Sequence, residues 1–233
     1  MARRLRARGH EVFTPTLTGM GERSHLGLGQ PIDLATHVHD VVAVLEFEDV
    51  RGAVLCGASY GGIAVTGAAD GAPDRVGMVI YVDALVPADG QSGLDLLPEP
   101  FAEAVREGVR DHGLGWRVPM PPELLEALVP EGSIPDHRRA AIVARITDHP
   151  AATFLDPIRL TGAIDRCPRA FVRCTGGDYS GELGGDPVEP IAARARAEGW
   201  AYRELSAPHD PHVFDADGTA AILDELPRAH DLA

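Results

Sequence analysis

The chain has 233 residues, of which 45% are hydrophobic and 24% charged, and its formal net charge at pH 7 is −14. This composition is typical of one globular domain, and its acidity disfavours nucleic acid and anionic membranes as partners. Three scattered cysteines without a C-x-x-C pair rule out a disulfide framework, and no apolar run approaches the roughly 18 residues of a membrane span. These features predict a cytoplasmic protein.

The first part of the chain alternates helical and β-rich stretches. Gly9 is suited to end the first helix, because glycine readily adopts the left-handed conformation, and Asp33 is suited to cap the second. The second strand is a continuous apolar run, so we expect it, Cys56 included, to be buried on both faces. The predicted elements are helices over residues 2–8, 33–48 and 61–73 and strands over residues 10–17, 52–59 and 76–85.

This rhythm breaks between residues 87 and 164, where prolines are frequent, β-forming residues are few, and short helical stretches follow one another. We expect residues 87–164 to form a helical cap inserted into a core made of residues 1–86 and 165–233. The last part of the chain then resumes the alternation, with strands at 169–175 and 200–205 and helices at 190–199 and 218–229. The whole pattern predicts an α/β fold with a mostly parallel sheet flanked by helices.

The stretch Gly57-Ala58-Ser59-Tyr60-Gly61 matches G-x-S-x-G between a predicted strand and a predicted helix, which is the context that this motif requires. Ser59 is then a nucleophile on a strained turn, in which side chains at Gly57 and Gly61 would collide. The N–H of Tyr60, at the start of the helix, is suited to stabilise an oxyanion. The alternative is a glycine-rich turn with an incidental serine.

A nucleophilic serine needs a base and an acid, in the chain order serine, acid, histidine. His209, in the loop after the last strand, is the expected base, and His212 is its rival. Asp178, just past the penultimate strand, is the expected acid, and Asp186 lies further along the same loop. Asp83, at the end of the third predicted strand, is the second candidate for the acid.

Five residues near these positions are expected to contact substrate, among them Arg23 in a glycine-containing loop that we interpret as a pocket edge. The expected substrate-binding residues are Arg23, Ala58, Asp83, Leu85 and His212. No metal site is predicted, because His37 and His39 point apart on a helix and the two histidines after the last strand are a weak pattern.

Together these features resemble the α/β-hydrolase superfamily, and within it small esterases akin to plant methylesterases and hydroxynitrile lyases and to their bacterial relatives. The resemblance implies a Ser59–His209–Asp178 triad under a helical cap, with no cofactor. The segments that carry it are RGHEVFTPTLTGMGERSHL, DLATHVHDVV, VLCGASYGG, YVDALVPADGQS and ELSAPHD. The chain departs from these relatives at the middle residue of the elbow, which is often histidine in the family and here is Ala58.

A second departure concerns the start of the sequence. Relatives begin with a strand and a His-Gly loop that supplies the second oxyanion donor, whereas here Met1 falls inside the first helix. In the family that strand lies between the ones at 10–17 and 52–59, so its absence leaves unpaired backbone groups on both sides. Three arrangements would resolve this. The chain starts further upstream, the strand at 10–17 pairs directly with that at 52–59, or another chain fills the gap between them. An open gap in the sheet favours a homodimer.

The residues favour a serine hydrolase that cleaves carboxylic esters through an acyl-enzyme, and the apolar cap suggests a small or medium hydrophobic substrate. Two alternatives keep the same scaffold. In one, the triad carries out a carbon–carbon lyase reaction, with the serine relaying a proton. In the other, the fold binds a small molecule without turning it over.

Overall fold

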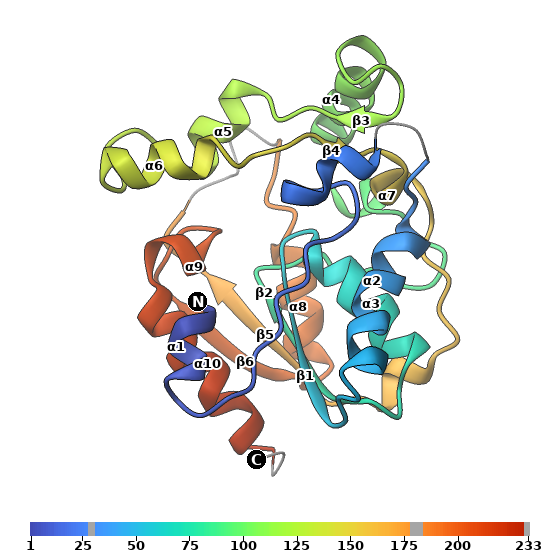
Figure 1. Ribbon diagram of the computed structural model, residues 1–233, viewed down its shortest axis with the longest axis vertical. Helices are drawn as coiled ribbons and strands as arrows, with labels where there is room; N and C mark the ends of the chain where they lie inside the picture. Colours follow the sequence, from blue (N-terminus) through green and yellow to red (C-terminus); the bar gives the residue numbers. More distant parts are fainter. Residues whose placement is uncertain (28–30, 178–183, 231–233) are drawn as a thin grey trace.

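The computed structural model describes residues 1–27, 31–177 and 184–230. Its centre is a parallel sheet in the order β1-β2-β5-β6, flanked by helices on both faces (Figure 1). The strands are β1 (Ala53–Ala58), β2 (Val76–Val82), β5 (Arg169–Cys174) and β6 (Ala201–Leu205). The helices α1 (Ala2–Arg6) and α10 (Ala216–Arg228) lie on one face, and α2 (Leu34–Phe47), α3 (Gly61–Gly71) and α8 (Glu189–Ala197) lie on the other. The predicted α/β fold is confirmed.

Alternation along β2 explains the three layers. Met78, Ile80 and Val82 pack toward α1 and α10, whereas Val79 and Tyr81 pack toward the other three helices. All five side chains are at most 4% exposed. A strand covered on both faces reads as a continuous apolar run, because alternate side chains enter two different cores.

The helices follow the local signals of the sequence. The carboxylate of Asp33 accepts the Thr36 N–H at 2.8 Å and so caps α2, as predicted. Gly9 ends the turn after α1 with a φ of +93°, a conformation that glycine adopts without strain. In the described ranges, none of the helices combines the length and the apolar character that crossing a bilayer requires.

We call residues 87–164, between β2 and β5, the inserted segment. Much of it lies across the top of the view in Figure 1, and its last residues run down the right side. Its main helices are α4 (Glu99–Asp111), α5 (Pro122–Leu128), α6 (Asp136–Val143) and α7 (Ala152–Leu155). The strands β3 (Arg117–Val118) and β4 (His149–Pro150) form an antiparallel pair in it that the sequence did not indicate. Of the short elements, η2 (Leu94–Leu96) lies inside it, η3 (Ala163–Arg166) begins at its end, and η1 (Gly21–Gly27) and α9 (Pro211–Phe214) lie outside it.

One predicted strand is wrong. Residues 10–17 form no strand, and they do not pair with β1. β1 is therefore an edge strand within the described residues, and Cys56, expected to be buried, is exposed on it. The two errors have different reasons, because Cys56 is exposed through packing into neither core, whereas the missing strand is a matter of backbone pairing. A strand needs a neighbour for its backbone groups, and its apolar character alone does not provide one.

Candidate active site

Ser59 sits on a strained turn at the end of β1. Its φ is +50°, in the left-handed region that residues other than glycine rarely adopt. The Ser59 carbonyl accepts the Leu85 N–H at 3.0 Å and the Gly62 N–H at 3.1 Å, and its own N–H donates to the Val82 carbonyl at 3.4 Å. These bonds hold the serine against the turn that follows β2, in the geometry of a nucleophile elbow.

The glycines of this turn do not all serve the purpose that the motif suggests. A Cβ on Gly57 would lie 2.6 Å from the Gly61 carbonyl oxygen, as expected, but a Cβ on Gly61 would meet no atom within 4 Å. The second crowded position is instead Gly62, whose Cβ would lie 2.3 Å from the Leu85 carbonyl oxygen. The prediction of a collision at Gly61 is therefore wrong, and it is the contact of α3 with the turn after β2 that requires glycine.

Asp83 follows β2, next to the serine turn. Its φ is +46° and its side chain is fully buried. One carboxylate oxygen accepts the Cys174 N–H at 3.0 Å and the Arg173 guanidinium at 2.6 Å. The other lies 2.8 Å from Nδ1 of His209. Burial closes Asp83 to substrate contact, and its partners suit it to the role of triad acid that the sequence left open.

His209 reaches Asp83 from the loop after β6. Because a carboxylate only accepts hydrogen bonds, Nδ1 carries the proton, and Nε2 of the neutral ring is the basic nitrogen. Burial lowers the pKa of His209, but the hydrogen bond and charge of Asp83, with the charge of Asp210, outweigh it and raise that pKa above its ordinary value. The pair has the arrangement of a general base and the carboxylate that orients it.

Arg173 was missed by the sequence reasoning. From the last position but one of β5 it binds Asp83 and also forms a short ion pair with Asp186. Asp186 additionally accepts the Val188 N–H at 2.9 Å before α8, so it is committed to Arg173 and this helix rather than to His209. The signal was a charged residue inside an otherwise apolar strand, which requires a buried partner. The expected acid, Asp178, lies outside the described residues.

The remaining predicted residues are spread more widely. Leu85 is buried in the core, and Ala58 packs on the α10 side of the sheet. Arg23 donates to the Thr16 carbonyl at 2.7 Å and to Asp40 at 3.1 Å, so it braces the first loop. Among the residues in place, Asp83 follows the strand beside the serine turn and contacts His209, whereas Arg23 makes its contacts elsewhere.

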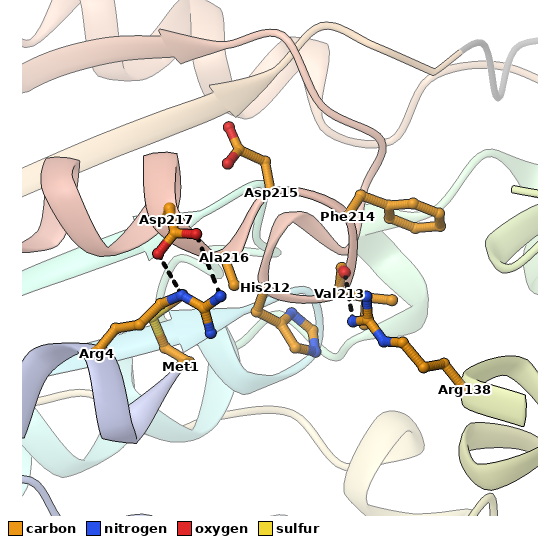
Figure 2. A pocket seen from close by; sticks show the side chains of 9 residues that line it. All are labelled: Met1, Arg4, Arg138, His212, Val213, Phe214, Asp215, Ala216 and Asp217. Atoms are coloured by element: carbon orange, nitrogen blue, oxygen red, sulfur yellow. Dashed lines mark hydrogen bonds and ion pairs between the residues drawn. The ribbon is translucent and has the colours of Figure 1, made fainter. Parts of the chain in front are cut away.

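His212 lines a separate polar cavity of about 360 Å³ (Figure 2). It lies between Arg4, which binds Asp217, and Arg138, which donates to the Val213 carbonyl at 3.1 Å. The cavity lining, made of Met1, Arg4, Arg138 and residues 212–217, contains neither the serine turn nor His209. No cluster of three or more metal-ligating side chains occurs in the described part of the chain.

Tyr60 connects Ser59 to α3. It is the N-cap residue of this 11-residue helix, so its N–H lies at the positive end of the helix dipole, directly after the serine. Its ring does not turn into solvent but packs against His149 and Phe154 of the inserted segment. The elbow and the inserted segment are thus in direct contact.

Comparison with known sequences gives two matches over much of the chain. The sequence model of the Alpha/beta hydrolase family matches residues 1–222. A carbendazim hydrolyzing esterase from Nocardioides sp. (strain SG-4G) is 34% identical over 166 residues, which are 68% of this chain and 65% of that protein. The match thus spans slightly less than two thirds of the relative's length.

Two solved structures illustrate the fold that the chain shares. An extracellular alpha/beta-hydrolase from a Paenibacillus species superposes with a TM-score of 0.81 at 19% identity, over 97% of this chain and 90% of its own. A methylesterase, MES16, from Arabidopsis superposes with a TM-score of 0.72 at 17% identity, over 100% of this chain and 92% of its own. At these identities the likeness is evidence of a common fold alone.

Proposed function

Because the chain belongs to the alpha/beta hydrolase family, whose sequence model matches residues 1–222, we propose that it is a serine esterase acting through Ser59, His209 and Asp83. The observation that carries the proposal is the 2.8 Å contact between His209 and the buried Asp83, beside a serine held at a φ of +50°. The esterase relative from Nocardioides, at 34% identity, supports the same class of reaction.

In the first half of the proposed reaction, the Ser59 hydroxyl attacks the ester carbonyl carbon and its proton passes to Nε2 of His209. Asp83 stabilises the imidazolium that forms. The carbonyl oxygen becomes an oxyanion, and the Tyr60 N–H at the start of α3 donates to it. When the intermediate collapses, the C–O bond to the alcohol breaks, the alcohol takes the proton from His209, and the acyl group stays on Ser59.

In the second half, water replaces the alcohol. His209 accepts a proton from the water as the water oxygen attacks the acyl carbon. When the bond between the Ser59 oxygen and the acyl carbon breaks, His209 returns the proton to that oxygen. The products are one carboxylic acid and one alcohol, and no redox partner is needed. We propose a small or medium hydrophobic ester as substrate, a choice supported by the esterase relative.

The test is covalent labelling by a fluorophosphonate together with turnover of p-nitrophenyl esters. We expect label on Ser59 of the folded protein, and loss of both label and turnover in Ser59→Ala. Ser133→Ala is the matched control, because Ser133 is an exposed residue of the inserted segment that only binds the Pro130 carbonyl. Both signals should survive in it.

Three results would contradict the proposal. Folded wild-type protein that resists labelling would remove the nucleophile. Turnover without an acyl-enzyme by mass spectrometry would favour carbon–carbon lyase chemistry, in which Ser59 relays a proton. Ligand binding that Ser59→Ala leaves unchanged, without turnover of activated esters, would favour a binding protein.

A further inference from the structure

The ring of Tyr60 packs against side chains from two distant parts of the chain, α2 and the inserted segment. His37 of α2 lies 5.7 Å from it between ring centroids, His149 of β4 lies 4.4 Å away, and Phe154 of α7 lies 4.8 Å away. His37 and His149 also meet edge to face at 5.7 Å. The residue that follows the nucleophile is therefore the centre of a cluster that joins α2, α3 and the inserted segment.

Hydrogen bonds fix the tautomer of His37 in this cluster. Its Nε2 lies 2.8 Å from the Thr18 carbonyl oxygen, which can only accept, so the proton is on Nε2. Nδ1 is then an acceptor, and the Tyr60 hydroxyl donates to it at 2.7 Å. The chain of donors runs from the Tyr60 hydroxyl through the imidazole to the backbone of the first loop.

The surroundings keep this imidazole neutral. His37 is fully buried, and burial lowers its pKa, although the bond to the Thr18 carbonyl and the charges of Asp40 and Asp33 act in the opposite direction. Arg23 of η1 and the ring of His149 face it from other elements, and the charge of Arg23 lowers the same pKa further. A neutral ring keeps one donor and one acceptor, which is what a link between a carbonyl and a hydroxyl requires.

We propose that His37 is a positioning residue that acts on the elbow through Tyr60. By binding the Tyr60 hydroxyl, it fixes the ring, and with it the main chain whose N–H serves the oxyanion. His37 touches neither substrate nor Ser59 in this role. The inference rests on the proposed function, because an oxyanion forms only if Ser59 attacks a carbonyl.

Kinetics of four variants test this inference. Tyr60→Phe and His37→Leu break the same bond, so each should lower kcat about tenfold with little change in KM, a size typical of imperfect positioning. The double variant should lose no more than either single one. His37→Gln should restore most of kcat, because its amide offers one donor and one acceptor without titrating. His39→Gln, on the exposed face of α2, is the matched control.

A second readout does not depend on activity. The ¹⁵N resonance of His37 Nδ1 should shift in Tyr60→Phe, since that nitrogen loses its donor. An unchanged resonance overturns the proposal. So does any of three kinetic results: a wild-type kcat in Tyr60→Phe, additive losses in the double variant, or a kcat of His37→Gln as low as that of His37→Leu. If His37→Leu does not fold, Tyr60→Phe and His37→Gln still decide the matter. Failure of the proposed function shows separately, as wild-type protein that neither labels nor turns over esters.

Discussion

Ser59 and Asp83 end neighbouring parallel strands, and both have a positive φ, +50° and +46°. Each such conformation costs on the order of 1–3 kcal/mol in a residue other than glycine, so the surrounding structure must hold it in place. The bonds from Leu85 to Ser59 and from Cys174 to Asp83 do so. The backbone strain is thus found at Ser59 and Asp83, whose side chains both extend from the carboxyl edge of the sheet.

Replacing Asp83 tests which carboxylate serves His209. Asp83→Asn should lower kcat on the order of 10²–10⁴-fold, because the amide no longer stabilises the imidazolium. Asp83 raises the pKa of His209, so its loss should also move the acidic limb of the kcat/KM profile to lower pH. The measurement is kcat/KM from pH 5 to pH 9, with Asp178→Asn as the parallel variant. A large loss in Asp178→Asn alone would make Asp178 the acid.

The sequence pointed to Ser59 and Tyr60 through a local motif and to His209 through its place in the loop after the last strand. G-x-S-x-G identifies Ser59 and Tyr60 because five adjacent residues define the turn. The acid is a different problem, since Asp83, Asp178 and Asp186 all follow strands, and the loop path decides which one meets His209. Arg173 and His37 act through contacts more than 20 positions away in the chain, for which the sequence carries no spacing signal.

At the level of elements, the packing of α3 on the turn after β2 sets the elbow. Gly62 lets the first turn of the helix approach the carbonyl of Leu85, and Gly61 faces open space beside it. Adjacent glycines therefore differ in what they contribute, although the motif treats Gly61 as the constrained one.

Alanine at each position separates these roles. Gly62→Ala should destabilise the protein by about 1–3 kcal/mol, because the methyl group meets backbone that cannot move aside cheaply. Gly61→Ala should be neutral or stabilising by up to about 1 kcal/mol, since alanine is the better helix former. Urea unfolding of both variants measures the difference. Equal stabilities would show that the helix shifts to accommodate the methyl group.

Most elements were predictable because periodicity and caps are local, as the Asp33 cap of α2 illustrates. The expected strand at 10–17 was wrong because strand formation depends on a neighbour that periodicity does not reveal. The β3–β4 pair was missed for the converse reason. Two residues on each side, His149 among them, are too few to show alternation.

At the level of the whole molecule, His37 and His149 tie the core to the inserted segment as neutral rings. Burial, with a contribution from His37, lowers the pKa of His149 to about 3. Below pH 6.5 the His149 side chain binds a proton in the unfolded chain but stays neutral in the folded protein, because folding lowers its pKa. Stability therefore falls as pH drops from about 6.5 toward 3.

The predicted homodimer and cytoplasmic location also concern the whole molecule, and both stay predictions.

Urea unfolding at pH 7.5 and pH 5.5 tests the predicted loss of stability at lower pH. His149 alone should account for a loss of about 1 kcal/mol between these two values, given 1.36 kcal/mol per pKa unit. His149→Phe keeps an aromatic ring that cannot bind a proton. Its free energy of unfolding should therefore fall by about 1 kcal/mol less than that of wild type between the two pH values. His137→Phe, at an exposed position of α6, is the control and should behave as wild type. A pH dependence in His149→Phe equal to that of wild type would contradict the assignment.

The open edge of β1 has a consequence for amide hydrogen exchange. The N–H groups of Ala53 and Ser59 both point toward β2, so alternation directs those of Val54, Cys56 and Ala58 to the open edge. In heavy water these three amides should exchange much faster than the amides of the residues between them, a two-residue rhythm within one strand. Slow exchange along all of β1 would instead reveal that a further strand covers this edge in solution.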